Sequence, residues 1–92
     1  MKAPFFSIII PTLNEEKFLP KLLESLSKQS DKDFEVIVVD GKSKDKTVEV
    51  AKKFEKKLPS LRVIVADTAS LPYQRNLGAK HAKSEWFVFV DA

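Results

Sequence analysis

Cysteine is absent from the sequence, and glycine occurs only twice among its 92 residues. Without cysteine the chain forms neither a disulfide framework nor a thiolate metal site, which suits a reducing compartment. Its glycines, Gly41 and Gly78, are too far apart for the G-x-G-x-x-G turn of dinucleotide-binding folds, and the sequence contains no P-loop. These absences count against a dinucleotide-binding enzyme and against a P-loop nucleotidase.

The sequence also lacks long hydrophobic runs and a strong charge of either sign. Its first apolar run is broken by Pro11, too early for a signal peptide or a membrane span. Sixteen basic and 13 acidic residues give a formal charge of +3. This excess is too small and too interleaved to indicate nucleic-acid binding, although it is compatible with a phosphate-bearing ligand or an anionic membrane surface. With 43% hydrophobic residues, the chain is expected to form one small globular domain.

Apolar periodicity predicts strands and helices that alternate along the chain. Four short apolar, β-branched or aromatic runs predict strands at 5–10, 34–39, 61–66 and 85–90. The intervening segments predict helices at 15–28, 45–57 and 71–82, and Phe18 belongs to the apolar stripe of the first. We expect Trp86 and the phenylalanines to lie in the core, and His81 to have a structural role near a helix end. This β-α-β-α-β-α-β order indicates an α/β fold with a parallel sheet and right-handed crossovers.

Polar residues follow every predicted strand. Asp40, Asp67 and Asp91 each come directly after one, while the first strand ends in Pro11 and Thr12. The carboxyl ends of parallel strands share one edge of the sheet, and open α/β sheets bind ligands at that edge. The sequence therefore predicts a ligand site there, with Asp40 accepting hydrogen bonds from a base or a ribose.

The segment after Asp40 has the composition of a turn that leads into a helix. Gly41 is expected to allow a sharp or left-handed turn, and Ser43 and Asp45 to cap the helix. The lysines at 42, 44 and 46 either form a solvated turn or steer an anionic ligand. Asn14 and Glu15 in the preceding loop have two similar interpretations, as helix-capping residues or as ligand contacts.

Two further candidates lie near the end of the chain. Arg75 either clamps a diphosphate through paired hydrogen bonds or belongs to a solvated helical face. Asp91 emerges from a strand built for burial and offers an oxygen ligand suited to Mg²⁺ or Mn²⁺. A single carboxylate is an incomplete metal site, so a second carboxylate should lie within a residue or two.

Three stretches, in order, resemble the amino-terminal part of family 2 glycosyltransferases, which have the GT-A fold. SIIIPTLNEE resembles the family's first strand and helix start, and VIVVDGKSKDKT resembles its VVDDGSxDGT motif. RNLGAKHAKSEWFVFVDA resembles the stretch that ends in the metal-binding DxD aspartates. The resemblance implies a three-layer α/β/α, Rossmann-like unit with strand order 3-2-1-4.

The resemblance also implies roles for individual residues. Asp40 would contact the base or ribose, Arg75 would face the base or diphosphate, and Asp91 would be the first DxD aspartate. The implied nucleotide-sugar-binding set is Pro11, Thr12, Asn14, Glu15, Asp40, Gly41, Arg75 and Asp91, with Asp91 also the metal ligand. Gly41 replaces the second aspartate of the VVDD motif and Lys42 its glycine, which leaves the base open.

On this resemblance, residues 1–92 form a single domain, the nucleotide-sugar-binding half of a glycosyltransferase that ends inside the DxD motif. The full-length enzyme would transfer a sugar from a nucleotide-diphosphate donor with Mg²⁺ or Mn²⁺, and its catalytic residues would lie beyond Ala92. The segment alone is expected to be inactive. We expect a cytoplasmic location, or the cytoplasmic face of a membrane that the parent protein contacts.

Other interpretations remain beside this one. The chain could be a complete non-catalytic module that binds nucleotide or associates with itself, and self-association through an exposed fourth strand is expected in any case. A phosphoacceptor receiver-like domain would need a carboxylate cluster after the first strand, where Pro11 and Thr12 stand.

Overall fold

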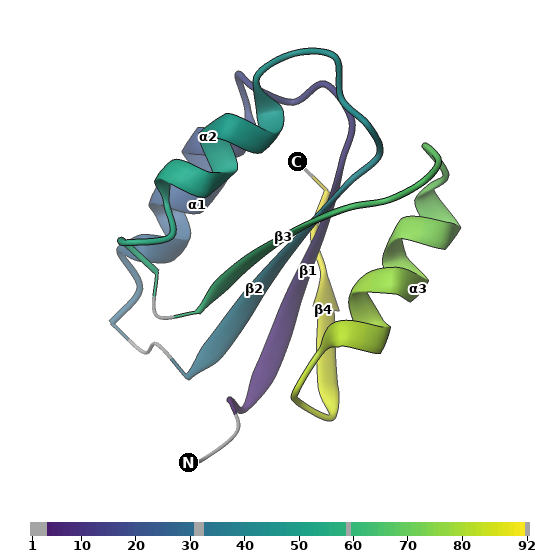
Figure 1. Ribbon diagram of the computed structural model, residues 1–92. Coiled ribbons are helices and arrows are strands. Elements are labelled where there is room, and N and C mark those ends of the chain that lie inside the picture. Colours follow the sequence, from purple (N-terminus) through teal and green to yellow (C-terminus); the bar gives the residue numbers. More distant parts are fainter. Residues whose placement is uncertain (1–3, 31–32, 59, 92) are drawn as a thin grey trace.

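The computed structural model describes residues 4–30, 33–58 and 60–91, which form one four-stranded sheet and three helices (Figure 1). The elements are β1 (Phe6–Thr12), α1 (Leu19–Ser27), β2 (Phe34–Asp40), α2 (Thr47–Lys53), β3 (Leu61–Val65), α3 (Leu71–His81) and β4 (Trp86–Phe89). The strands lie in the order β3-β2-β1-β4, and every neighbouring pair is parallel. The predicted α/β fold and its strand order are confirmed.

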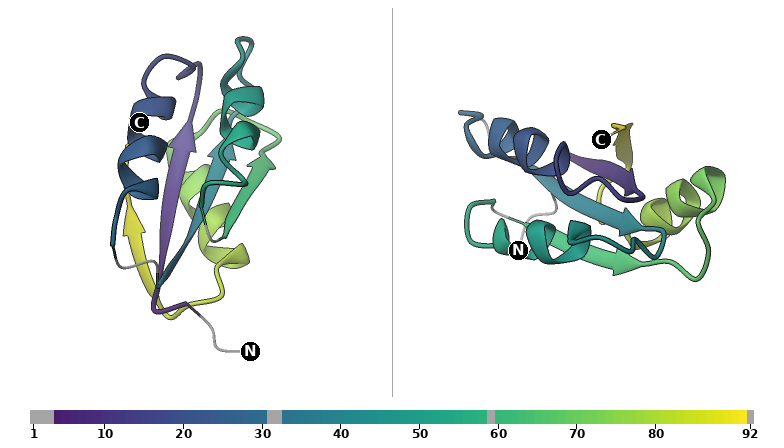
Figure 2. Two further views of the ribbon diagram at one scale, coloured as in Figure 1. Left: turned by 90° about the vertical axis from the view of Figure 1, so that its left-hand side faces the viewer. Right: turned by 90° about the horizontal axis from the view of Figure 1, so that it is seen from above.

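Helices cover both faces of the sheet. α1 and α2 lie side by side on one face and α3 lies on the other, as both views in Figure 2 show. Alternate residues of β1 and β2 supply the two cores, with Ile8 and Val36 under α1 and α2, and Ile9 and Ile37 under α3. None of the helices in the described part of the chain is long and apolar enough to cross a membrane.

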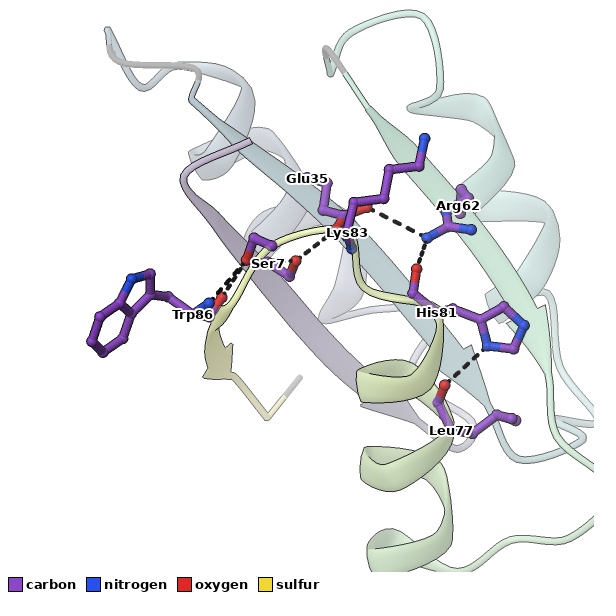
Figure 3. Close-up of polar contacts among 8 residues, drawn as sticks. Ser7, Glu35, Arg62, Leu77, His81, Lys83 and Trp86 are labelled. Carbon is purple, nitrogen blue, oxygen red and sulfur yellow. Dashed lines mark hydrogen bonds and ion pairs between the residues drawn. The ribbon is translucent and has the colours of Figure 1, made fainter. Parts of the chain in front are cut away.

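At the amino ends of the strands, a buried acid ties β2 to the turn between α3 and β4 (Figure 3). The side chain of Glu35 is almost fully buried and accepts hydrogen bonds from the Ser7 hydroxyl at 2.6 Å and the Lys83 N–H at 2.5 Å. Arg62 of β3 approaches the same carboxylate at 3.4 Å and donates to the His81 carbonyl. These contacts anchor the carboxyl end of α3 against the sheet.

Two predicted boundaries at the β1–α1 connection are wrong. β1 does not stop before Pro11 but continues through Thr12, paired with Val39 and Asp40 of β2. The backbone nitrogen of Pro11 points toward the β4 side of β1, as the backbone groups of Ile9 do. The Ile9 carbonyl accepts from the Val90 N–H, and the β1–β4 pairing ends at Ile9, so Pro11 is tolerated. On that side no strand of the described residues requires the N–H that proline lacks.

The first helix is shorter than predicted and is not capped as predicted. α1 begins at Leu19, and its N-cap residue is Phe18, which makes no side-chain capping bond. Phe18 was expected on the buried stripe, yet it is 62% exposed because it precedes the helix. Asn14 does not cap α1, because it adopts a left-handed conformation with φ of 55°.

The prediction that Trp86 and the phenylalanines lie in the core holds for Phe34 but fails for Phe5, Phe18 and the aromatic residues of β4. Trp86 is 64% exposed, and Phe87, Val88 and Phe89 are exposed as well. β4 is an edge strand that pairs only with β1. Within the described residues no helix covers it as α3 covers β1 and β2, so its apolar side chains remain uncovered.

The central turn of α3 packs directly on the sheet at Gly78. A Cβ atom at this position would lie 2.5 Å from Ile9 Cγ2 and 3.1 Å from Val39 Cγ2. Both neighbours are fully buried, β-branched side chains with little freedom to move. The glycine is therefore needed for the close approach of α3.

Gly78→Ala should lower the free energy of unfolding, since overpacking a core costs roughly 1–3 kcal/mol and outweighs a helix-propensity gain of about 1 kcal/mol. Urea denaturation measures the difference. Asn76→Ala, at an exposed position of the same helix, is the control and should stay within about 0.5 kcal/mol of the parent. A Gly78→Ala variant as stable as the parent would contradict the close approach.

Candidate functional site at the carboxyl edge of the sheet

Asp40 lies at the centre of the carboxyl edge and is fully buried. Its Oδ1 accepts from the hydroxyls of Thr12 at 2.8 Å and Ser43 at 2.6 Å, and its Oδ2 accepts from the Ser43 N–H at 2.7 Å. The carboxylate thus joins the end of β1, the end of β2 and the following loop. Because it has no exposed surface, Asp40 shapes the edge rather than facing solvent.

Gly41 was predicted to allow a sharp or a left-handed turn, and the left-handed alternative is wrong. Among the described residues, positive φ angles occur only at Asn14 and Lys42. Gly41 is instead required by crowding, because a Cβ there would lie 2.8 Å from Gln74 Oε1 and 3.0 Å from the Ala69 backbone. The β3–α3 connection therefore approaches the end of β2 closely.

Gln74, which no sequence pattern indicated as a site residue, links α3 to this edge by hydrogen bonds. Its side chain is 4% exposed, and its Nε2 donates to the Thr12 carbonyl at 3.0 Å and the Val39 carbonyl at 2.8 Å. These two bonds hold the ends of β1 and β2 together beneath the first turn of α3. Apolar periodicity predicts the burial of apolar residues only, so the sequence pattern could not predict that Gln74 is buried.

Hydrogen bonds between side chains and backbone N–H groups connect the loops after β1 and β2. Ser43 Oγ accepts from the Asn14 N–H at 2.8 Å, and Thr47 Oγ1 accepts from the Glu15 N–H at 2.8 Å. In return, the Asn14 side-chain oxygen accepts from the Lys44 N–H at 2.8 Å. Ser43 was predicted to cap α2, but it bonds to Asp40 and to the neighbouring loop instead.

Asp45 also connects the two loops by a hydrogen bond. Its carboxylate accepts from the Thr47 N–H at 2.9 Å, from the Thr47 hydroxyl and from the Glu16 N–H at 3.3 Å. Burial alone would raise the pKa of Asp45. The hydrogen bonds from Thr47, Glu16 and its own N–H outweigh burial and hold the pKa below the usual 3.8.

Arg75 and Asp91 form a second group at this edge. Arg75 Nη2 lies 3.7 Å from Asp91 Oδ1, and the guanidinium lies 5.8 Å from the centre of the Phe89 ring. Arg75 Nε is sealed from solvent and has no hydrogen-bond partner among the described residues. The Asp91 side chain is 74% exposed, so the pair opens on to solvent.

The structure brings some of the predicted site residues together and leaves others apart. One group consists of Thr12, Asp40 and Gly41, which contact Gln74 or one another. Asn14 and Glu15 are connected to the β2–α2 loop through their backbone N–H groups. Arg75 and Asp91 pair with each other. Asp67, which also follows a strand, is exposed and makes no hydrogen bond or ion pair with the described residues.

A small pocket opens between β1 and the start of α3. Its volume is about 160 Å³, and it is lined by Pro11, Thr12, Leu13, Ala69, Leu71 and Gln74. A larger cavity of about 570 Å³ lies away from this edge, between α3 and β4, with Tyr73 and Phe87 among its walls. We regard the smaller pocket as the candidate site because two buried polar residues of the carboxyl edge, Thr12 and Gln74, line it.

The described residues do not complete a metal site. No group of three or more histidine, cysteine or acidic side chains is placed to hold an ion among residues 4–30, 33–58 and 60–91. Asp91, the predicted metal ligand, is paired with Arg75. The donor set present therefore amounts to one carboxylate.

Known proteins similar to this chain are glycosyltransferases. The Glycosyl transferase family 2 model matches residues 7–92. A PGL/p-HBAD biosynthesis glycosyltransferase of Mycobacterium tuberculosis is 42% identical over 93 residues, covering 100% of this chain and 36% of the relative. This chain therefore spans about a third of that relative's length.

Solved structures share the fold. TarS residues 1–349 from S. aureus, in complex with UDP-GlcNAc, match with a TM-score of 0.88 at 43% identity, over 95% of this chain and 26% of that chain. The mannosyltransferase PcManGT from Pyrobaculum calidifontis, in complex with GDP-Man and Mn²⁺, matches with a TM-score of 0.87 at 25% identity. That match covers 99% of this chain and 28% of PcManGT.

The lowered pKa of Asp45 predicts a pH dependence of stability. A folded-state pKa below the unfolded value contributes stability that is present above pH 3.8 and lost as the pH falls through the folded-state pKa. The unfolding free energies of the parent and Asp45→Asn should therefore differ at pH 6 and converge on acidification. Urea denaturation from pH 6 to pH 3 tests this, with Asp67→Asn as the control. A constant difference across this range would show that the Asp45 charge is not involved.

Proposed function

This chain belongs to glycosyltransferase family 2, and on that premise we propose that the carboxyl edge of its sheet binds the nucleoside diphosphate of a sugar donor. The sheet has the strand order β3-β2-β1-β4, and the chain matches the TarS structure with a TM-score of 0.88, in keeping with a GT-A type fold. The proposed nucleotide-sugar-binding set is Pro11, Thr12, Asn14, Glu15, Asp40, Gly41, Arg75 and Asp91, some of which contact the ligand and some of which position the contact residues. Asp40 contributes by holding Thr12 and the β2–α2 loop in place, since its own oxygens are engaged.

The observation that carries this proposal is the Arg75 guanidinium at the same edge as the pocket. Its side chain is 39% exposed, and its Nε, like that of Arg62, has no hydrogen-bond partner among the described residues. A diphosphate oxygen on the exposed side of the guanidinium would gain charge-assisted hydrogen bonds. Guanidinium groups bind phosphate through paired hydrogen bonds. The ion pair with Asp91 is long, at 3.7 Å, and partly exposed, so an incoming anion competes with a weak contact.

The activity of the whole protein is a further proposal, because this chain spans 36% of the mycobacterial relative and 26% of the TarS structure. We propose that the full protein transfers a sugar from a nucleotide-diphosphate donor to an acceptor. Residues 1–92 would supply its donor-nucleotide half and would be inactive as a transferase alone. Mn²⁺ is present in the PcManGT complex, and a divalent cation in the full enzyme would take Asp91 as one ligand.

We place the protein in the cytoplasm or at the cytoplasmic face of a membrane. The cysteine-free composition supports this location, since it fits a reducing compartment. The modest positive charge is compatible with contact between the parent protein and an anionic membrane surface. Neither its composition nor its charge pattern indicates a nucleic-acid partner.

Nucleotide titration tests the proposed donor site. UDP or GDP should shift the amide NMR signals of Thr12, Glu15, Gly41 and Arg75. Arg75→Gln should weaken binding of the diphosphates by about 10- to 100-fold, the value of a charge-assisted hydrogen bond, and leave binding of uridine or guanosine unchanged. Lys80→Gln, which removes an exposed cation from the same helix, is the control. Absence of shifts at millimolar nucleotide would rule out the donor site in this chain.

We also propose that β4 mediates self-association with a second copy of the chain. Its exposed run Trp86, Phe87, Val88 and Phe89 has no charged residue, and its outer edge has no strand partner among the described residues. Such an edge presents unpaired N–H and C=O groups that can pair with the same edge of another copy.

Val88→Lys should dissociate this assembly, because an edge lysine opposes strand pairing by charge and hydration. Light scattering at increasing protein concentration should show a larger mass for the parent than for the variant. Val65→Lys is the matched control, since Val65 is 53% exposed on β3 at the opposite edge. A parent chain that remains monomeric at high concentration would contradict the proposal.

A further inference from the structure

We propose that Gln74 reads the base of the bound nucleotide, with its Oε1 accepting a hydrogen bond from a ring N–H. This inference rests on the proposed function and adds a specificity determinant to it. The base class is one with a ring N–H beside a carbonyl, as in uracil, thymine or guanine. Cytosine and adenine have a ring nitrogen acceptor at the corresponding position, and two acceptors facing each other would repel.

The orientation of the Gln74 carboxamide follows from its surroundings. Nε2 faces two backbone carbonyl oxygens, those of Thr12 and Val39, at 3.0 Å and 2.8 Å. A flipped amide would place Oε1 against both of these acceptors, so only one orientation is compatible with hydrogen bonding. Oε1 is therefore held on the opposite side of the group from the two strand ends.

Oε1 is the unused polar atom of an otherwise buried side chain. It accepts no hydrogen bond from the described residues, and Gln74 as a whole is 4% exposed. Oε1 is not fully sealed and keeps a small solvent-accessible surface. Gln74 lines the small pocket beside Pro11, Thr12 and Leu13, and a ligand donor in that pocket would complete its hydrogen bonding.

Gly41 explains why this acceptor comes from α3. Oε1 lies 2.8 Å from the point that a Cβ at position 41 would occupy. A side chain at position 41 and the Gln74 carboxamide cannot both fill this space. The carboxamide is there in this chain, and no acid at position 41 competes with it. The acceptor offered to the base is consequently neutral.

A panel of nucleoside diphosphates tests the proposal on the whole chain. UDP, GDP, CDP and 3-methyl-UDP are titrated by calorimetry against the parent and Gln74→Met. Gln29→Met, the same substitution at an exposed position after α1, is the control. UDP and GDP should bind the parent about tenfold more tightly than CDP and 3-methyl-UDP, as expected for one ring N–H bond in a buried site. In Gln74→Met this preference should disappear while CDP binding is retained, and Gln29→Met should behave as the parent.

Gly41→Ala provides a second test that leaves Gln74 in the chain. Its Cβ would displace the carboxamide, so the preference for a ring N–H should again be lost. This variant decides the matter if Gln74→Met does not fold. Equal binding of the four nucleotides to the parent, or a uniform weakening of all four in the variants, would overturn base reading and leave Gln74 a structural residue. Failure of the parent to bind any nucleotide would instead overturn the proposed function itself.

Discussion

The carboxyl edge depends on a single buried carboxylate. Asp40 has no exposed surface, and burying a charged group is unfavourable unless hydrogen bonds replace its hydration. Thr12 and Ser43 supply those bonds with two hydroxyls and one N–H. Because these donors come from the end of β1 and from the β2–α2 loop, movement of either segment would remove hydrogen bonds from a buried charge. The geometry of the pocket wall follows from this requirement.

The loop after Asp40 extends this constraint to the neighbouring loop. Residues 42–47 alternate, with the lysines exposed and the residues between them turned toward the protein. Ser43, Asp45 and Thr47 accept from the N–H groups of three successive residues, 14–16. Short polar side chains that would ordinarily cap their own helix thus satisfy the backbone leading into α1, where Phe18 offers no cap.

Much of the fold could be predicted from the sequence, because the apolar runs of β1 and β2 and the stripe of α1 have the periods of buried strands and an amphipathic helix. The position of the site could be predicted for the same reason, since strand order places Thr12, Asp40 and Asp91 at one edge. The hydrogen bonds within the site could not be predicted. Apolar patterns carry no information on which polar side chain meets which N–H group, and composition alone suggested a cap for Ser43.

Errors elsewhere have equally specific causes. Pro11 was expected to end β1, but whether a proline interrupts a strand depends on which side requires its N–H, and that depends on where β4 stops. Trp86 was expected in the core because aromatic residues are usually buried, but burial requires a covering element. Both errors concern partners distant in sequence, which local patterns do not reveal.

The position of α3 shows how polar contacts can take the place of an apolar stripe. Its buried residues are Gln74 and Gly78, neither of which is a large hydrophobic side chain. Gln74 binds the ends of β1 and β2, Gly78 rests on Ile9, and the turn after the helix is held by Glu35 at the far end of β2. Directional bonds at both ends and a close contact in the middle leave the helix little freedom to slide or rotate. Arg75, one residue after Gln74, is therefore carried to the carboxyl edge by contacts that it does not make itself.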